Sequence, residues 1–194
     1  MKELVAKAQN VTNLTYNANI SALSIHILMA IFGFIASRGI IFDSFMPFGL
    51  VFVAACDTVF LPSIAIGAFI GYFIPSSITG GFKYIAALLA VIAVKLILSG
   101  YKKLCNNPFF FGAVAAASNA VTSFVTYSGV PLDLLNLAAE CIIIFSCVFV
   151  TQRAFLTLSN HRVGFSLEEL SCFICAAVII IIGLMDFYIF KLSI

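Results

Sequence analysis

The sequence predicts an all-α fold: a polytopic helical membrane bundle with six to seven transmembrane helices and a cytoplasmic N-terminus. Three observations predict this class. Hydrophobic residues make up 63% of the chain, charged residues make up only 9%, and apolar runs fill nearly all of residues 21–190. A soluble domain carries about 25% charged residues. Because one helix needs roughly 20 apolar residues to cross a bilayer core, 194 residues allow six or seven crossings.

Seven apolar runs are expected to form the helices, after a polar cytoplasmic leader at residues 1–20. The runs span 21–36, 45–56, 59–74, 84–98, 109–127, 132–150 and 170–190. The second and third runs are short and carry Pro47 and Pro62 near their starts, where a helix tolerates proline. They are predicted to form a tight helical hairpin around Asp57 and Thr58, and the sequence leaves open whether both of them span.

Basic residues in the short connectors orient the bundle, because cytoplasmic loops are rich in Lys and Arg. Seven crossings place six basic residues inside (Lys2, Lys7, Lys102, Lys103, Arg153, Arg162) and three outside (Arg38, Lys83, Lys191). Six crossings would spoil this bias. The chain then ends outside at Ile194, directly after a helix, and we expect that this marks an interruption of a longer protein.

Composition also excludes several classes of function. The net charge is only +2 and the basic residues are scattered, so no nucleic-acid partner is expected. The six cysteines lie mostly in apolar runs, where a thiol behaves as a small hydrophobe. No catalytic triad, phosphate loop, carboxylate pair or zinc pattern is recognisable. We therefore expect neither an enzyme nor a resident cofactor or metal in this chain.

Polar side chains inside apolar runs are the candidate functional residues, because they are costly in lipid. Asp133, Asn136 and Glu140 share one face of the sixth run, and Asn119 lies in the fifth. Asn119 and Glu140 are each about ten residues from the turn that joins the two runs, so both lie about 15 Å deep. A hydrogen bond between them is predicted. It is either a polar clasp between helices or part of a proton or ion site.

Four further residues are candidates for structural roles. Lys95 is expected to extend to the inner surface, with a Lys95–Glu140 pair as the alternative. Arg38 borders the first outer turn, where Asp43 is a possible partner. Gly67 and Gly71 have the GxxxG spacing that lets a neighbouring backbone approach closely, within the chain or between chains.

Three stretches together resemble the N-terminal membrane region of stage II sporulation protein E, a family of endospore-forming Firmicutes. The first is Gly33-Phe-Ile-Ala-Ser-Arg38 with Met46-Pro47-Phe48-Gly49 and Phe52-Val53-Ala54-Ala55. The second runs from Ala139-Glu140 to Gln152-Arg153, and the third is Ser166-Leu-Glu168-Glu169-Leu-Ser-Cys172-Phe173. Their order and spacing extend the resemblance over roughly residues 25–190.

The resemblance implies about ten membrane helices, a central cytoplasmic region and a C-terminal manganese-dependent serine phosphatase. That phosphatase acts on an anti-sigma-factor antagonist and so activates the first forespore-specific sigma factor. The membrane region is expected to anchor it at the polar septum, to self-associate and to associate with the tubulin-like division protein. This chain lacks the phosphatase and its metal-binding aspartates. Arg38 and Glu140 lie on family-like motifs, and our hypothesis is that they orient helices.

Two other interpretations remain open at the level of the sequence. The chain could be the substrate-binding membrane subunit of an energy-coupling-factor importer, with the Asn119 and Glu140 face as its site. It could also be a stand-alone membrane scaffold that recruits partners through its short loops.

Overall fold

The computed structural model describes residues 23–41, 45–74, 78–105, 107–126 and 134–159, and scattered helical residues between 170 and 181. These residues carry helices and one isolated antiparallel bridge between Ile41 and Phe45, and no strand is present among them. The all-α prediction is therefore confirmed. The leader at residues 1–20 and most of the seventh run lie outside the described residues.

The first six predicted runs carry helices whose bounds the structure gives. The first contains the helix Leu23–Arg38. The others contain α2 (Phe48–Ala55), α3 (Leu61–Phe73), α4 (Ile78–Ile97), α6 (Pro108–Thr126) and α7 (Leu134–Ser159), and the short α5 (Lys102–Cys105) lies between α4 and α6. The largest differences are that α4 begins at Ile78, well before the expected start at Tyr84, and that α7 continues past Val150.

Local chemistry explains where α3 and α6 begin. Pro62 lies in the first turn of α3, where the missing amide hydrogen removes no helical hydrogen bond. Pro108 opens α6, and the Asn107 side chain caps it. The Asn107 Oδ1 accepts the backbone amides of Phe109 at 3.0 Å and Phe110 at 3.4 Å.

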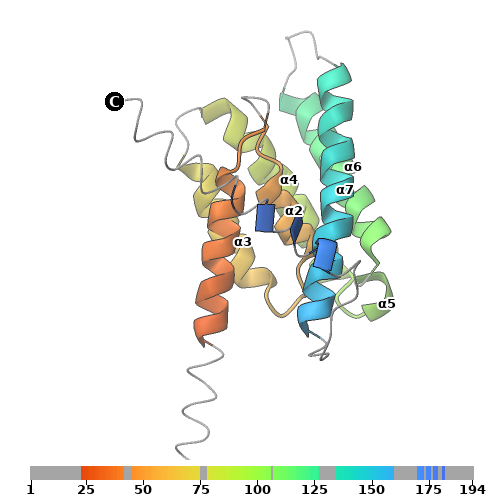
Figure 1. The fold of residues 1–194 in the computed structure, drawn as a ribbon. Coiled ribbons are helices and arrows are strands. Elements are labelled where there is room, and N and C mark those ends of the chain that lie inside the picture. The colour runs from red at the N-terminus through yellow and green to blue at the C-terminus, as the bar shows by residue number, and fades with distance from the viewer. Residues whose placement is uncertain are drawn as a thin grey trace, which may run out of the picture.

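The short helix α2 lies in the middle of the bundle (Figure 1). It contacts α3, α4, α6 and α7. Its eight residues are all buried, and so is Cys56, which follows them. At 1.5 Å per residue α2 is about 12 Å long, less than half of the roughly 30 Å hydrocarbon core. The predicted short hairpin thus consists of a buried half-length helix, α2, and the longer α3.

Glycines bring the helix Leu23–Arg38 close to α3. A Cβ atom at Gly67 would overlap the carbonyl oxygen of Ala30, and one at Gly71 would overlap the Ser37 side chain. A Cβ atom at Gly33 would in turn overlap the carbonyl oxygen of Ile64. The structure places the GxxxG face of α3 against another helix of the same chain.

Two described helices are long and apolar enough to cross a membrane by length and composition: α6 over Pro108–Val125 and α7 over Leu134–Phe155. Leu23–Arg38 and α3 are shorter apolar helices. Six to seven crossings are therefore not confirmed by this measure.

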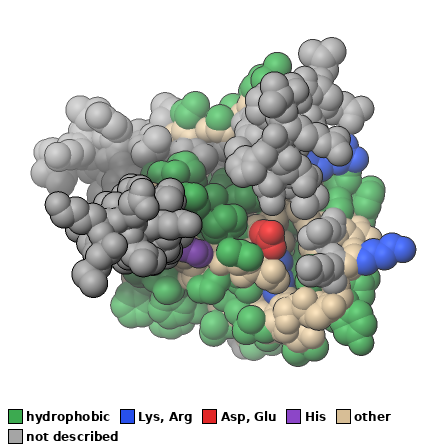
Figure 2. Space-filling model, turned by 90° about the horizontal axis from the view of Figure 1, so that it is seen from below, with side chains coloured by type: hydrophobic (Ala, Val, Ile, Leu, Met, Phe, Trp, Pro, Cys, Tyr) green, Lys and Arg blue, Asp and Glu red, His purple; other side chains and the backbone are tan. Residues whose placement is uncertain are grey.

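The outer surface of the described part is strongly apolar. Figure 2 shows one end of the molecule, where green hydrophobic side chains are frequent and charged ones are few among the described residues. Ile97, Val125 and Leu135 each expose more than 70% of their surface, from three different helices. Exposed apolar side chains on this scale are unusual for a soluble monomer and are consistent with association with a membrane.

Candidate functional site: a buried half-length helix with polar contacts at both ends

The backbone groups at the two ends of α2 need hydrogen-bond partners inside the bundle. The first amides and the last carbonyls of any helix lack partners within the helix. In a long transmembrane helix these groups reach water or headgroups, but α2 begins and ends among buried residues. Because an unsatisfied backbone group is costly in such surroundings, side chains must supply partners.

Two tyrosine hydroxyls supply the partners at the N-terminal end of α2. The Tyr72 hydroxyl, from α3, accepts the Leu50 amide at 2.9 Å and donates to the Met46 carbonyl oxygen at 2.8 Å. The Tyr84 hydroxyl, from α4, accepts the Met46 amide at 2.9 Å. The two rings stack with their centroids 5.4 Å apart. Both hydroxyls thus form hydrogen bonds with backbone groups at the N-terminal end of α2.

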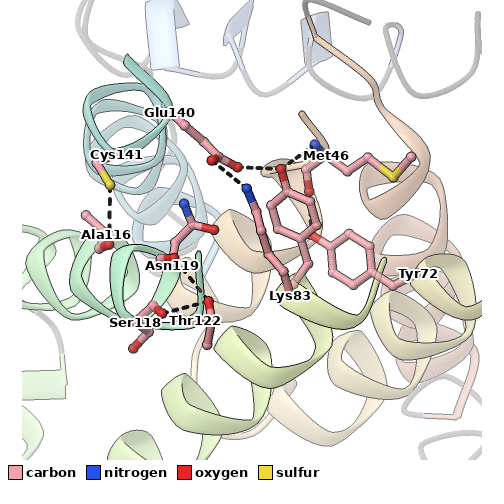
Figure 3. A network of polar contacts seen from close by, with 10 residues as sticks. Met46, Tyr72, Lys83, Ala116, Ser118, Asn119, Thr122, Glu140 and Cys141 are labelled. Carbon is pink, nitrogen blue, oxygen red and sulfur yellow. Dashed lines mark hydrogen bonds and ion pairs between the residues drawn. The ribbon is translucent and has the colours of Figure 1, made fainter. Parts of the chain in front are cut away.

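Glu140 extends this arrangement to α7 (Figure 3). The Tyr84 hydroxyl donates to its Oε1, and the Lys83 ammonium donates to its Oε2 at 2.7 Å. Both charged residues are buried, Lys83 with 5% and Glu140 with 1% of its surface exposed. The Lys83 Nζ also lies 4.7 Å from the centre of the Tyr84 ring and 5.7 Å from that of Phe45. The pair neutralises both charges and joins α4 to α7 beside the start of α2.

Lys95 supplies the partner at the other end of α2. Its Nζ donates to the carbonyl oxygen of Cys56, the C-cap residue, at 2.5 Å, and lies 3.8 Å from the Cys56 Sγ. The ammonium also lies 5.0 Å from the centre of the Phe111 ring. A cation at a helix C-terminus interacts favourably with the helix dipole. Lys95 therefore caps α2 from α4.

The predictions for Lys95 differ from this geometry. Lys95 is only 1% exposed, so its side chain does not extend to the inner surface. It also does not pair with Glu140, whose cation is Lys83. The reason is the carbonyl end of the half-length helix α2, which offers a closer buried acceptor.

Asn119 and Glu140 both lie in the bundle interior, on the adjacent helices α6 and α7, but the predicted hydrogen bond between them is absent. Asn119 is fully buried, and apart from the Cys141 thiol its Oδ1 and Nδ2 have no hydrogen-bond partner within the described part of the chain. The Cys141 thiol lies beside the carboxamide, although its Sγ donates to the Ala116 carbonyl oxygen at 3.5 Å. Glu140 instead accepts hydrogen bonds from two residues of α4, Lys83 and Tyr84.

The remaining candidates lie apart from this site. Asn136 is exposed on α7, although it shares the predicted helical face with the buried Glu140. Asp133 and Asp43 lie outside the described residues. Arg38 is half-buried at the end of the first helix. Gly67 and Gly71 pack against that helix.

Sequence reasoning missed Lys83, Tyr72, Tyr84 and Cys56. A signal for the tyrosines was present, because a hydroxyl in an apolar run needs a buried partner. Lys83 was assigned to an outer loop because the fourth run was predicted to begin at Tyr84. Since α4 begins at Ile78, Lys83 lies inside the helix.

The arrangement has no sign of a metal centre. Among the described residues, no group of three or more His, Cys, Asp and Glu side chains could hold a metal ion. The side chains at the two ends of α2 bind backbone groups and each other. What they provide chemically is a fixed position for a buried short helix.

One comparison with known proteins gives a match. A family described as "SpoIIE, N-terminal domain" matches residues 1–194, the whole chain. The match is to an N-terminal domain and includes no phosphatase catalytic domain. No curated protein and no solved structure matches the chain.

Proposed function

Because the chain belongs to the SpoIIE N-terminal domain family, we propose that it is the membrane-embedded anchor of a sporulation phosphatase. It holds a C-terminal serine phosphatase, which uses manganese and lies outside this chain, at the polar septum during endospore formation. The family match over the whole chain carries this proposal. The domain content of the chain itself is non-catalytic. The importer alternative receives no support from the match.

The membrane part of the proposal is a bundle with seven crossings and the N-terminus inside. The apolar surface and the two long apolar helices support membrane association. In Figure 1 the start of the first helix, the α2–α3 connection, α5 and the end of α7 all lie at one end of the bundle. Asp57, Lys103 and Arg153 belong to this end and are exposed. This end is the cytoplasmic one in the proposal.

The position of Lys83 strengthens the charge argument for this orientation. Lys83 was one of three basic residues assigned to the outer side, but it is buried against Glu140. Without it, the outer side keeps two of the three, Arg38 and Lys191, against six inside. The excess of basic residues on the cytoplasmic side therefore becomes larger.

The proposed partners are the lipid bilayer, a second copy of the chain and the tubulin-like division protein. Gly67 and Gly71 are covered by the helix Leu23–Arg38. Self-association would therefore use a different face from the GxxxG motif.

A localisation experiment tests the proposal. A fluorescent protein is fused to the cytoplasmic N-terminus of residues 1–194 and expressed in a sporulating Firmicute that lacks its own SpoIIE. The matched control carries the same fluorescent protein on an unrelated seven-helix anchor. We expect the fusion to accumulate at the polar septum while the control spreads over the cell membrane. An even distribution of both proteins would contradict the proposal.

A further inference from the structure

Asn119 is the buried polar side chain that the contacts around α2 leave without a role. It is fully buried on α6, and apart from the adjacent Cys141 thiol its carboxamide has no hydrogen-bond partner among the described residues. Ser123 lies one turn further along the same face and is 1% exposed, and its Oγ has no partner among the residues that the structure describes. Buried carboxamides and hydroxyls are nearly always hydrogen-bonded in native proteins. Two of them together on one helix face indicate a bound polar group.

The Lys83–Glu140 pair has unused hydrogen-bonding capacity, and Glu140 directly precedes Cys141, the α7 residue that interacts with Asn119. Figure 3 shows the Asn119 side chain on α6 and Cys141 on α7, and the Cys141 thiol interacts with Asn119, Glu140 and Lys83. An ammonium group has three N–H donors, and Lys83 donates a hydrogen bond only to Glu140 among the described residues. Each Glu140 oxygen accepts one hydrogen bond there and can accept another. Hydrogen-bond donors and acceptors are thus available both on α6, from Asn119 and Ser123, and in the Lys83–Glu140 pair.

The charges decide which ligand fits. Lys83 already neutralises Glu140, and Asn119 and Ser123 carry no charge. An added cation or anion would leave an uncompensated charge in the bundle interior, which is strongly unfavourable. A neutral molecule that both donates and accepts hydrogen bonds satisfies all of these groups. Water has that chemistry, and buried waters typically make about three hydrogen bonds to such groups.

We infer that Asn119, Ser123 and the Lys83–Glu140 pair form a binding site for an ordered water between α4, α6 and α7. This inference is independent of the proposed function. It favours a water-mediated contact between these helices over an ion site at this depth.

Radiolytic footprinting of the full chain in lipid nanodiscs tests the site. X-rays convert water to hydroxyl radicals, which oxidise the side chains beside it. Cys141 lies next to Asn119, and Cys147, half-buried on the same helix, is the matched control. We expect Cys141 to be oxidised several-fold faster than Cys147. In the Asn119→Leu variant the two rates should become similar. Equal oxidation rates of Cys141 and Cys147 in the wild type would overturn the inference. Because this comparison uses only the wild type, it tests the inference even if the variant does not fold.

Thermal unfolding of the same samples gives an independent result. If Asn119 holds a water, Asn119→Leu removes hydrogen bonds and lowers the unfolding temperature. A higher unfolding temperature would show that the carboxamide binds nothing, and it would overturn the inference. The wild type is also unfolded in sodium chloride and in choline chloride at equal ionic strength. Specific stabilisation by sodium that Asn119→Leu abolishes would replace the water with a cation and overturn the inference as well.

Discussion

At the scale of single residues, each described charge in the bundle interior has a specific partner. Glu140 binds Lys83 and Tyr84, and Lys95 binds the carbonyl oxygen at the end of α2. Isolated charges at such depth are expensive, whereas a paired and hydrogen-bonded charge is tolerated. The position of these residues inside the bundle therefore follows from what they bind. This explains why a chain with so few charged residues buries three of them.

Removing one member of the Lys83–Glu140 pair should be far more harmful than removing both. Lys83→Met or Glu140→Gln leaves the other residue as a buried unpaired group, and loss of one partner of a buried pair costs about 3–5 kcal/mol. The double variant removes both charges and keeps an acceptor for the Tyr84 hydroxyl. We expect it to recover most of the lost stability, as measured by denaturant unfolding in detergent micelles.

The control for this cycle is Arg153→Met. Arg153 is exposed and lies with its guanidinium 4.8 Å from the centre of the Phe149 ring. An exposed contact of this kind is worth about 0.5–1 kcal/mol. Strictly additive losses in the double variant would contradict the pairing of Lys83 with Glu140.

At the scale of elements, the half-length helix α2 organises its neighbours. Tyr72 from α3, Tyr84 and Lys95 from α4, and Glu140 from α7 all contribute to contacts at its two ends. The element thus requires particular side chains from three other helices. On the far side of α3, close glycine contacts with the helix Leu23–Arg38 accompany a hydrogen bond between His26 and Ser63 at 2.8 Å.

The glycine contact gives a prediction with a close control inside the chain. Gly67→Ala introduces a methyl group onto the Ala30 carbonyl oxygen, so the helix Leu23–Arg38 must move away from α3. Overpacking of this kind costs about 1–3 kcal/mol. Gly100→Ala meets nothing within 4 Å and should change stability by less than about 0.5 kcal/mol. The free energies of unfolding of both variants in micelles check the difference, and equal effects would show that this helix pair is not tightly packed.

At the scale of the whole molecule, the sequence predicted helices better than it predicted their partners. Apolar runs gave the all-α class, and the depth of Asn119 and Glu140 placed both in the bundle interior. The depth of a residue follows from counting along a helix, but the rotation of each helix about its axis does not. Glu140 was therefore matched with Asn119 or Lys95, whereas α4 turns Lys83 and Tyr84 toward it. The acceptor for Lys95 could not be predicted from side-chain types because it is the backbone carbonyl of Cys56.

The central proposal is that this chain is a membrane bundle whose α2–α3 connection lies on the cytoplasmic side together with α5. Thiol accessibility in intact cells tests it most directly. All six native cysteines are replaced by alanine, and single cysteines are introduced by Asp57→Cys, Lys103→Cys and Ile74→Cys. The first two positions are exposed at the proposed inner end, and Ile74 is exposed at the opposite end of α3. We predict that a membrane-impermeant reagent labels Ile74→Cys in intact cells, and labels Asp57→Cys and Lys103→Cys only after permeabilisation. Labelling of Asp57→Cys and Lys103→Cys from opposite sides would contradict the account.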